Sequence, residues 1–280
     1  MAFLDALKHK EKRLFDSIRA AGSLIVAYSG GVDSAYLAHA AQRVLGDASL
    51  AVTANSASYP RSHSQMAERV AREFGLRHRT IQTREVQNPE YAANPVNRCY
   101  FCKTELFDVL EALRNELGIE AVAYGVNADD LGDFRPGHLA AEEHRVLAPL
   151  LDAGLSKPEI RALSRETGLP TAEIPASACL SSRIPYGMEV TPEKLIQIDR
   201  GEDALRALGF EQVRVRHHGE LARVEVATPE LPRALVPEMA ARISAAIKEV
   251  GFRWVSLDLD GYRMGSLNEV LQIQPPGPTR

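Results

Sequence analysis

The chain has 280 residues, 45% hydrophobic and 25% charged, as expected for a globular enzyme of one large domain or two smaller ones. Its formal net charge of −4 argues against a protein held to nucleic acid or to an anionic membrane by bulk charge. No apolar run approaches the roughly 20 residues that span a bilayer. Residues 1–12 contain no apolar signal segment, so we expect a cytoplasmic protein without a membrane anchor.

Residues 1–185 read as strands that alternate with helices. Helical patterns cover residues 5–21, 34–44, 62–74, 104–117 and 157–167. Apolar runs predict strands at residues 24–28, 50–54, 78–83, 121–126 and 146–150. This alternation favours a parallel sheet covered by helices on both faces. We therefore predict an α/β fold with a parallel, doubly wound sheet in this part of the chain.

The pattern changes after Pro185. Helices are predicted at residues 192–208 and 235–250, a hairpin at 213–226 and a last strand at 254–259. The order αββαβ predicts a small α+β domain at residues 190–272, for substrate binding or oligomerisation. The proline-rich residues 273–280 are expected to form a disordered tail.

The segment Ser29-Gly30-Gly31-Val32-Asp33-Ser34 lies between a predicted strand and a predicted helix. The glycines permit close approach of the backbone to a ligand, and the helix N-terminus favours an anion. Ser29 and Ser34 can add hydroxyl donors, whereas Asp33 would repel phosphate unless it holds a Mg²⁺ ion between itself and the anion. The alternative is a glycine-rich turn with an aspartate cap. In this strand–loop–helix context we expect a nucleotide phosphate site.

The hexapeptide resembles the PP-loop of the ATP pyrophosphatase superfamily, whose members transfer AMP to a carboxylate or carbonyl oxygen. Asn127 lies in Tyr124-Gly125-Val126-Asn127-Ala128-Asp129-Asp130, at a strand end where such sheets bind ligands. Lys157 opens Lys157-Pro158-Glu159-Ile160-Arg161, which resembles a segment common in the superfamily, although a solvated helix-start lysine is equally open. The resemblance implies an adenine nucleotide alpha hydrolase-like fold that binds ATP through residues 29–34, Asn127 and Lys157.

Three further segments, at residues 97–103, 127–137 and 177–183, resemble the LarE family. That family makes the pyridinium bis-thiocarboxylate mononucleotide of the nickel-pincer cofactor, and the resemblance spans nearly the whole chain. It implies an ATP-dependent sulfurtransferase that adenylates the carboxylates of pyridinium-3,5-biscarboxylic acid mononucleotide and converts them to thiocarboxylates. The expected partners are this mononucleotide and sulfide or another sulfur donor, in a homo-oligomer.

The chain has three cysteines, an odd number that favours thiols or metal ligands over a disulfide framework. Cys99 and Cys102 are three residues apart at a helix start, which puts both sulfur atoms on one side, and Arg98 and Lys103 favour thiolates. The resemblance to the LarE family implies that the loop of Cys179 faces the PP-loop. The three thiolates could then hold a [4Fe–4S] cluster whose fourth iron binds a transferable sulfide. We favour this cluster.

Other uses of these cysteines stay open. Some LarE proteins have only the cysteine that matches Cys179, and they give up its sulfur and leave dehydroalanine. Cys99 and Cys102 could also hold zinc, with His138 or His144 as a further ligand, or form a redox pair or two buried thiols. Arg183, four residues after Cys179, is expected to be a cation of the site.

Basic residues also gather on the predicted hairpin. Alternation puts Arg214 and Arg216 on the same face, where they could clamp the phosphate and carboxylate of a mononucleotide. The alternative is a solvated face that Glu220 and Glu225 balance. The resemblance favours the clamp.

Two other functions stay open. One is a tRNA thiolase of the same superfamily, against which the negative net charge and the small second domain argue, so nucleic acid is not expected as a partner. The other is a PP-loop ligase or amidase that uses ammonia and holds zinc as a structural ion.

Overall fold

The structure is a computed structural model that describes residues 2–132, 136–174 and 178–263. The chain divides into two compact units, Met1–Ser177 (unit 1) and Ala178–Arg280 (unit 2). The division falls earlier than the predicted domain end at residue 185, so that Cys179 and Arg183 belong to unit 2. The predicted tail, residues 273–280, and residues 264–272 of the predicted second domain lie outside the described residues, as do residues 133–135 and 177 of the segments singled out above.

Unit 1 is built on a four-stranded sheet. Its strands, in the order β3-β2-β1-β4, are all parallel, which confirms the predicted fold class. They are β1 (Leu24–Ala27), β2 (Ser49–Asn55), β3 (His78–Gln82) and β4 (Ala121–Tyr124). β1 is apolar throughout because both faces of the sheet are covered: Leu24 and Val26 belong to one core cluster and Ile25 to another.

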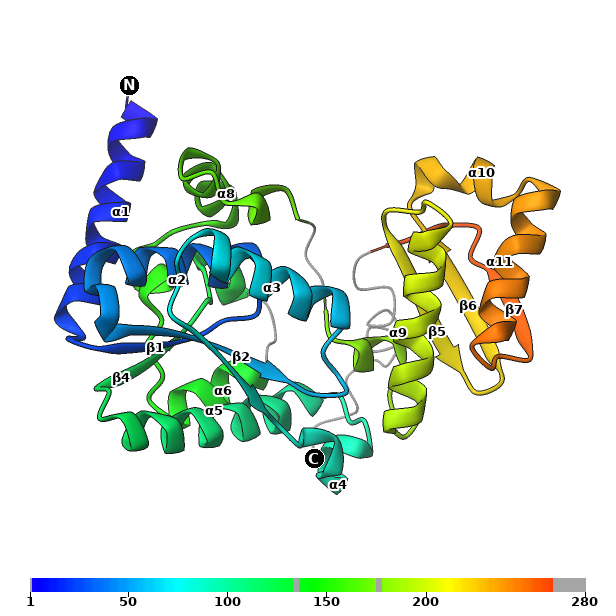
Figure 1. Cartoon of the computed structure of the whole chain (residues 1–280), viewed down its shortest axis with the longest axis horizontal. Coiled ribbons are helices and arrows are strands. Elements are labelled where there is room, and N and C mark those ends of the chain that lie inside the picture. Colours follow the sequence, from blue (N-terminus) through cyan, green and yellow to red (C-terminus); the bar gives the residue numbers. More distant parts are fainter. Residues whose placement is uncertain (1, 133–135, 175–177, 264–280) are drawn as a thin grey trace, which may run out of the picture. The chain divides into compact units, whose positions relative to one another are not determined.

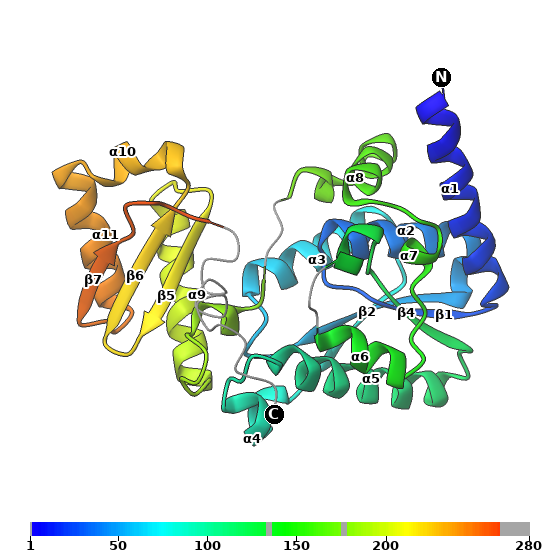
Figure 2. The same cartoon turned by 180° about the vertical axis from the view of Figure 1, so that it is seen from behind.

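Helices cover both faces of this sheet (Figures 1 and 2). One face packs against α1 (Ala2–Ala20), α2 (Val32–Leu45), α3 (Arg61–Glu73) and α8 (Lys157–Glu166). The other face packs against α5 (Arg98–Leu117) and α6 (Pro136–Glu143). Two short helices, α4 (Pro89–Ala92) and α7 (Pro149–Asp152), complete the α-helices described in unit 1.

The predicted fifth strand at residues 146–150 is wrong. A single parallel bridge pairs Leu147 with Ala123, where the Leu147 N–H donates to the Val122 carbonyl at 2.8 Å. Pro149 then begins α7 and has no N–H to extend the ladder. The helix predicted from Thr104 begins earlier, at Arg98, and therefore includes both Cys99 and Cys102.

Unit 2 is a three-stranded sheet with helices on one face. β5 (Val213–His218) and β6 (Leu221–Val226) form the predicted hairpin, and β7 (Trp254–Leu257) lies parallel to β6. The helices are α9 (Pro192–Ala207), α10 (Leu231–Ala234) and α11 (Pro237–Glu249). Val213, Val215 and Val224 point into the core formed with α9 and α11, so the alternating positions Arg214, Arg216, Arg223 and Glu225 share the opposite face.

Among the residues that the structure describes, no helix combines the length and the apolar character needed to cross a bilayer.

Candidate functional site: the nucleotide loop and the cysteine-bearing segments

The glycine-rich loop joins β1 to α2 at the carboxyl end of the parallel sheet (Figure 1). Gly30 has φ +66°, a backbone conformation that favours glycine. A Cβ atom at Gly30 would also lie 3.1 Å from the Cβ atom of Ala67 in α3. The loop therefore packs closely against α3, and a side chain at position 30 would strain the backbone and crowd Ala67.

Serine hydroxyls close the loop on itself. The Ser29 N–H donates to Ser34 Oγ at 3.1 Å, and the hydroxyls of Ser29 and Ser34 lie 3.1 Å apart. Ser34 Oγ also donates to the Gly31 carbonyl at 3.1 Å, where Gly31 is the N-cap of α2 and Val32 its first residue. The six predicted residues thus form the turn after β1 and the first residues of α2, with two hydroxyls beside the helix N-terminus. Such an arrangement suits an anion.

Asp33 and Lys157 lie together. Lys157 Nζ donates to Asp33 Oδ2, and the Lys157 N–H donates to Asp129 Oδ2 at 2.8 Å. Asp33 Oδ1 is buried and has no hydrogen-bond partner among the described residues. Burial raises the pKa of the Asp33 carboxyl above its ordinary value, although the charge of Lys157 opposes the shift. The carboxylate therefore retains an unsatisfied oxygen that a cation could occupy.

Asn127 organises the turn after β4. Its buried side chain accepts from the Asp129 N–H at 2.9 Å, while its own N–H donates to Asp130 Oδ2 at 3.0 Å. The turn in this way directs Asp129 toward the start of α8. The structure therefore connects the predicted residues Asn127 and Lys157 through Asp129, which the sequence analysis did not single out.

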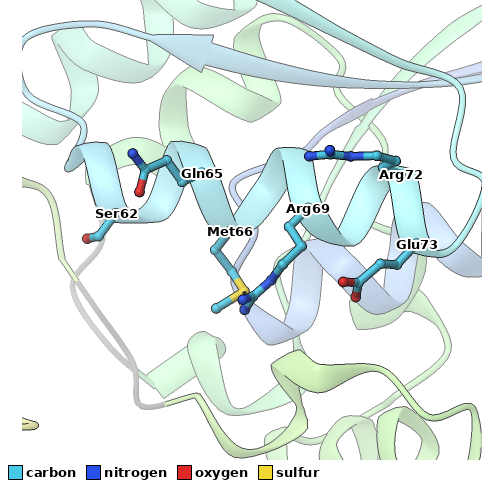
Figure 3. A pocket seen from close by; sticks show the side chains of 6 residues that line it. All are labelled: Ser62, Gln65, Met66, Arg69, Arg72 and Glu73. Carbon is cyan, nitrogen blue, oxygen red and sulfur yellow. Dashed lines mark hydrogen bonds between the residues drawn. The ribbon is translucent and has the colours of Figure 1, made fainter.

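A groove of about 530 Å³ runs along one side of α3 (Figure 3). Within it, Arg69 Nη2 donates to Met66 Sδ at 2.9 Å. None of the predicted site residues lines it, so we do not assign it to the nucleotide. Its lining residues are Ser62, Gln65, Met66, Arg69, Arg72 and Glu73.

The three cysteines lie in two different units. Cys99 is exposed and Cys102 half-buried, both near the start of α5 in unit 1. Cys179 is half-buried in unit 2, where it caps the 3₁₀ turn Leu180–Arg183. In the described ranges 2–132, 136–174 and 178–263, no three His, Cys, Asp or Glu side chains are grouped so that they could hold a metal ion. The three-cysteine cluster stays a prediction.

Arg183 is fully buried at the end of this turn. Its guanidinium bonds both carboxylate oxygens of Glu202, at 2.8 and 3.1 Å. Its Nη1 donates to the carbonyls of Ala178 and Cys179, at 2.6 and 2.9 Å. Burial would lower the pKa of Arg183, but Glu202 and Cys179 raise it. Arg183 therefore fixes the backbone that carries Cys179, with Glu202 as its counter-charge.

Arg214 and Arg216 share one face, as predicted, but their surroundings differ. Arg216 forms a two-pronged ion pair with buried Glu225, at 2.9 and 2.8 Å, and donates to the Ser182 carbonyl at 3.0 Å. Arg214 donates to the Val213 carbonyl and lies 4.8 Å from the centre of the Tyr262 ring. Burial lowers the pKa of Arg214, and the nearby Arg183 lowers it further, whereas Glu202 opposes the shift. Arg214 is therefore a buried cation whose positive charge is disfavoured by its surroundings.

Besides Asp129, three features of the site escaped the sequence analysis. Gly125 directly follows β4, and a Cβ atom there would lie 2.8 Å from the Ser34 nitrogen. Glu202 carries the counter-charge for Arg183, from a different element of the chain. Glu85 is buried under the loop after β2. Nothing in the local sequence marks the two glutamates, whereas Gly125 stood within a segment already noted.

Comparison with known proteins adds the family. Residues 13–97 match the asparagine synthase family model. The chain is 45% identical over 247 residues to an uncharacterized protein of Synechocystis sp., covering 88% of this chain and 92% of that one. It is 28% identical to a component of the glutamine-hydrolyzing GMP synthase of Pyrococcus furiosus, over 65% of this chain and 61% of that one.

The pyridinium-3,5-bisthiocarboxylic acid mononucleotide synthase of Lactiplantibacillus plantarum is 33% identical over 269 residues. The match covers 95% of this chain and 96% of that protein, so it includes both units. A resemblance first carried by the glycine-rich loop and three short segments thus extends over the whole fold, and the chain belongs to the LarE family, within the PP-loop superfamily of ATP-using enzymes.

Proposed function

We propose that the chain is an ATP-dependent sulfurtransferase that adenylates the carboxylates of pyridinium-3,5-biscarboxylic acid mononucleotide and converts them to thiocarboxylates. The observation that supports this most is the loop of residues 29–34, with Asp33 and Lys157 beside it. The similarity to the Lactiplantibacillus plantarum synthase over both units supports the choice of substrate.

In this proposal the nucleotide phosphates bind to the N–H groups and hydroxyls of residues 29–34. Asp33 would hold a Mg²⁺ ion, since its buried Oδ1 has no partner among the described residues, and this ion would neutralise phosphate charge. One protein carboxylate suffices, because Mg²⁺ takes its other ligands from phosphate and water. Lys157, released from Asp33, would then turn to the phosphates. The substrate carboxylate attacks the α-phosphorus, and pyrophosphate leaves.

The proposed substrate clamp lies in unit 2. Arg214 carries a buried positive charge that no carboxylate hydrogen-bonds directly within the described residues, so an anionic group could pair with it. Arg216 is held by Glu225 and would contribute charge rather than a free guanidinium edge. We therefore assign phosphate binding chiefly to Arg214.

Sulfur would come from the cysteines. Cys99, Cys102 and Cys179 each keep some accessibility, and their thiolates would suit the ligand set of a [4Fe–4S] cluster. Such a cluster would supply a sulfide for transfer. In the alternative, the Cys179 thiolate attacks the acyl-adenylate carbonyl and AMP leaves. Loss of the Cys179 α-proton then breaks its Cβ–S bond, so that the product keeps the sulfur and the chain keeps dehydroalanine.

The proposal is tested by incubating anaerobically prepared protein with ATP, MgCl₂, sulfide and the mononucleotide. We expect release of pyrophosphate and AMP and a product heavier by about 16 Da for each oxygen that sulfur replaces, as the atomic masses of the two elements require. Tight, salt-resistant binding of tRNA would favour the thiolase instead. An ammonia-dependent product without sulfur would favour a ligase or amidase. We also propose that the enzyme is cytoplasmic and forms a homo-oligomer.

A further inference from the structure

We infer that Glu85 is a positioning residue for the nucleotide loop, which is the glycine-rich loop of residues 29–34. It acts through the segment Ser56–Tyr59. This inference rests on the proposed function, because it concerns how that loop is held for ATP. Glu85 does not touch the loop itself. A chain of hydrogen bonds connects it to the Ser29 carbonyl.

The first step of the chain is a buried carboxylate that binds two serine hydroxyls. Glu85 is only 2% exposed, and its Oε1 accepts from Ser56 Oγ at 2.5 Å and from Ser58 Oγ at 2.6 Å. The two hydroxyls lie 3.0 Å apart, and Ser56 Oγ also accepts from the Ser58 N–H at 3.2 Å. A charged acceptor makes such bonds shorter and stronger than a neutral one. Glu85 thereby fixes the backbone that follows β2.

The second step joins this segment to the loop. The Tyr59 N–H donates to the Ser56 carbonyl at 3.1 Å, which closes a turn, and the Tyr59 hydroxyl donates to the Ser29 carbonyl at 2.8 Å. Burial raises the pKa of Tyr59, so its hydroxyl stays protonated and able to donate. The first residue of the nucleotide loop is therefore braced by the segment that Glu85 holds.

A second support passes through α3. Pro60 is the N-cap of α3, so the segment held by Glu85 leads directly into this helix. Ala67 of α3 lies against Gly30 and accepts a hydrogen bond from the Tyr28 hydroxyl at 3.2 Å. The start of the nucleotide loop is contacted by the Tyr59 hydroxyl and by Ala67. The positions of both contacts therefore depend on residues 56–60.

The position of the Glu85 carboxylate in the fold indicates a role at the nucleotide loop. In the described part of unit 1, no Lys or Arg forms an ion pair with Glu85, although burying a carboxylate is costly. Glu85 follows β3 and its serine partners follow β2, so the network lies at the carboxyl ends of two parallel strands. That edge of a parallel sheet is where ligands bind.

The test is a double-mutant cycle on the full chain, with MgATP binding measured by calorimetry and stability by thermal unfolding. We expect Glu85→Ala to raise the dissociation constant about tenfold and Tyr59→Phe to raise it about fivefold. The double variant should bind no more weakly than Glu85→Ala, because both changes interrupt the same chain. Glu85→Gln should keep the affinity within about twofold, since its carboxamide oxygen accepts both hydroxyls.

Ser58→Ala and Ser49→Ala form a matched pair, since both serines are buried and lie toward opposite ends of β2, Ser49 as its first residue and Ser58 in the segment that follows it. Ser49 bonds Gln42 and the Gly46 carbonyl, away from the loop. Both variants should lose stability, and only Ser58→Ala should weaken MgATP binding, which keeps the test decisive if Glu85→Ala fails to fold. Additive effects in the cycle, or unchanged affinity in Ser58→Ala, would overturn the inference. Absence of MgATP binding by the wild type would overturn the proposed function as well.

Discussion

At the scale of single residues, the partner of each buried charge determines whether that charge is available to a ligand. Arg216 and Arg214 are two positions apart on β5 and point to the same face. Glu225 already pairs with Arg216 through two hydrogen bonds, whereas Arg214 makes no such bond among the described residues. Arg214 and Arg216 occupy equivalent positions in the strand pattern, but within the part of the chain that the structure describes only the guanidinium of Arg216 is already paired with a carboxylate.

This difference predicts opposite outcomes for two alanine variants. Arg216→Ala leaves the Glu225 carboxylate buried with only Arg223, and should cost about 3–5 kcal/mol of unfolding free energy. Arg214→Ala should cost less stability but raise KM for the mononucleotide while leaving the affinity for ATP unchanged. Steady-state kinetics and urea unfolding of both variants check the prediction. Equal effects of the two variants on KM would contradict it.

Asp33 gives a second prediction at this scale. Asp33→Asn removes the charge expected to hold Mg²⁺, and pyrophosphate release should fall at least about a hundredfold. Stability at pH 7 should not fall, because the raised pKa means that the folded protein disfavours the charged carboxylate. Asp16→Asn, at an exposed aspartate of α1, is the control. An unaffected release rate would remove Asp33 from the mechanism.

At the scale of elements, the end of β4 meets the first turn of α2 so closely that no side chain fits between them. A Cβ atom at Gly125 would lie 2.8 Å from the Ser34 nitrogen and 3.1 Å from the Asp33 carbonyl carbon. These are backbone atoms, which cannot move aside as a flexible side chain can. The position of the nucleotide loop therefore depends on a glycine that follows a different strand.

Gly125→Ala should displace the start of α2 and weaken MgATP binding at least about tenfold. Gly75→Ala is the matched control. Gly75 has φ +61°, so alanine costs about 1 kcal/mol there, but nothing lies within 4 Å of the new Cβ. Calorimetry should show weaker binding for Gly125→Ala alone, and equal affinities would contradict the close approach.

The helix α9 and the turn Leu180–Arg183 are joined by a buried ion pair that titrates. Burial alone would raise the pKa of Glu202, but Arg183 and the neighbouring arginines lower it below its ordinary value. A depressed pKa means that the stabilisation is present above about pH 4.3 and is lost as pH falls through the folded-state pKa. We expect unit 2 to unfold at progressively lower temperature over that acidic range.

Trp254, the single tryptophan, lies in β7 and reports on unit 2 by its fluorescence. Glu202→Gln should lower the stability seen by this probe by about 3–5 kcal/mol at pH 7 and weaken its dependence on acid. Glu173→Gln, at an exposed carboxylate of unit 1, should leave the signal unchanged. A Glu202→Gln curve that parallels the wild type at every pH would contradict the prediction.

At the scale of the whole molecule, the proposed cluster would draw its ligands from both units. Cys99 and Cys102 belong to unit 1 and Cys179 to unit 2. If all three hold one cluster, replacing any one by serine should bleach the visible absorption and stop sulfur transfer, while adenylation continues. Losses should be strongly non-additive, and one chain should make many products at unchanged mass.

If Cys179 itself gives up its sulfur and becomes dehydroalanine, the expected results are reversed. Only Cys179→Ser would be inactive, Cys99→Ser and Cys102→Ser would matter little, and each chain would stop after losing the mass of H₂S. Anaerobic turnover counting with intact-mass spectrometry distinguishes the two routes. A colourless, active protein with that mass loss at Cys179 would remove the cluster and leave the sulfurtransferase proposal standing.

The sequence by itself determined the parallel sheet, the hairpin of unit 2 and the glycine-rich turn between β1 and α2. These features are local: apolar runs, glycine positions and helix starts depend on nearest neighbours along the chain, so they can be read in order. The segment at residues 146–150 shows the limit of such reading. It is apolar enough for a strand, but Pro149 and a single bridge to β4 allow no ladder.

Only the tertiary structure decided how charges are paired. Glu202 with Arg183, Glu225 with Arg216, Lys157 with Asp33, and Glu85 with two serines all join residues from different elements. Composition and residue spacing do not distinguish these buried charged residues from charged residues at the surface. Burial makes the difference, because a charge removed from water must be paired or hydrogen-bonded, and which partner it meets depends on how the elements pack.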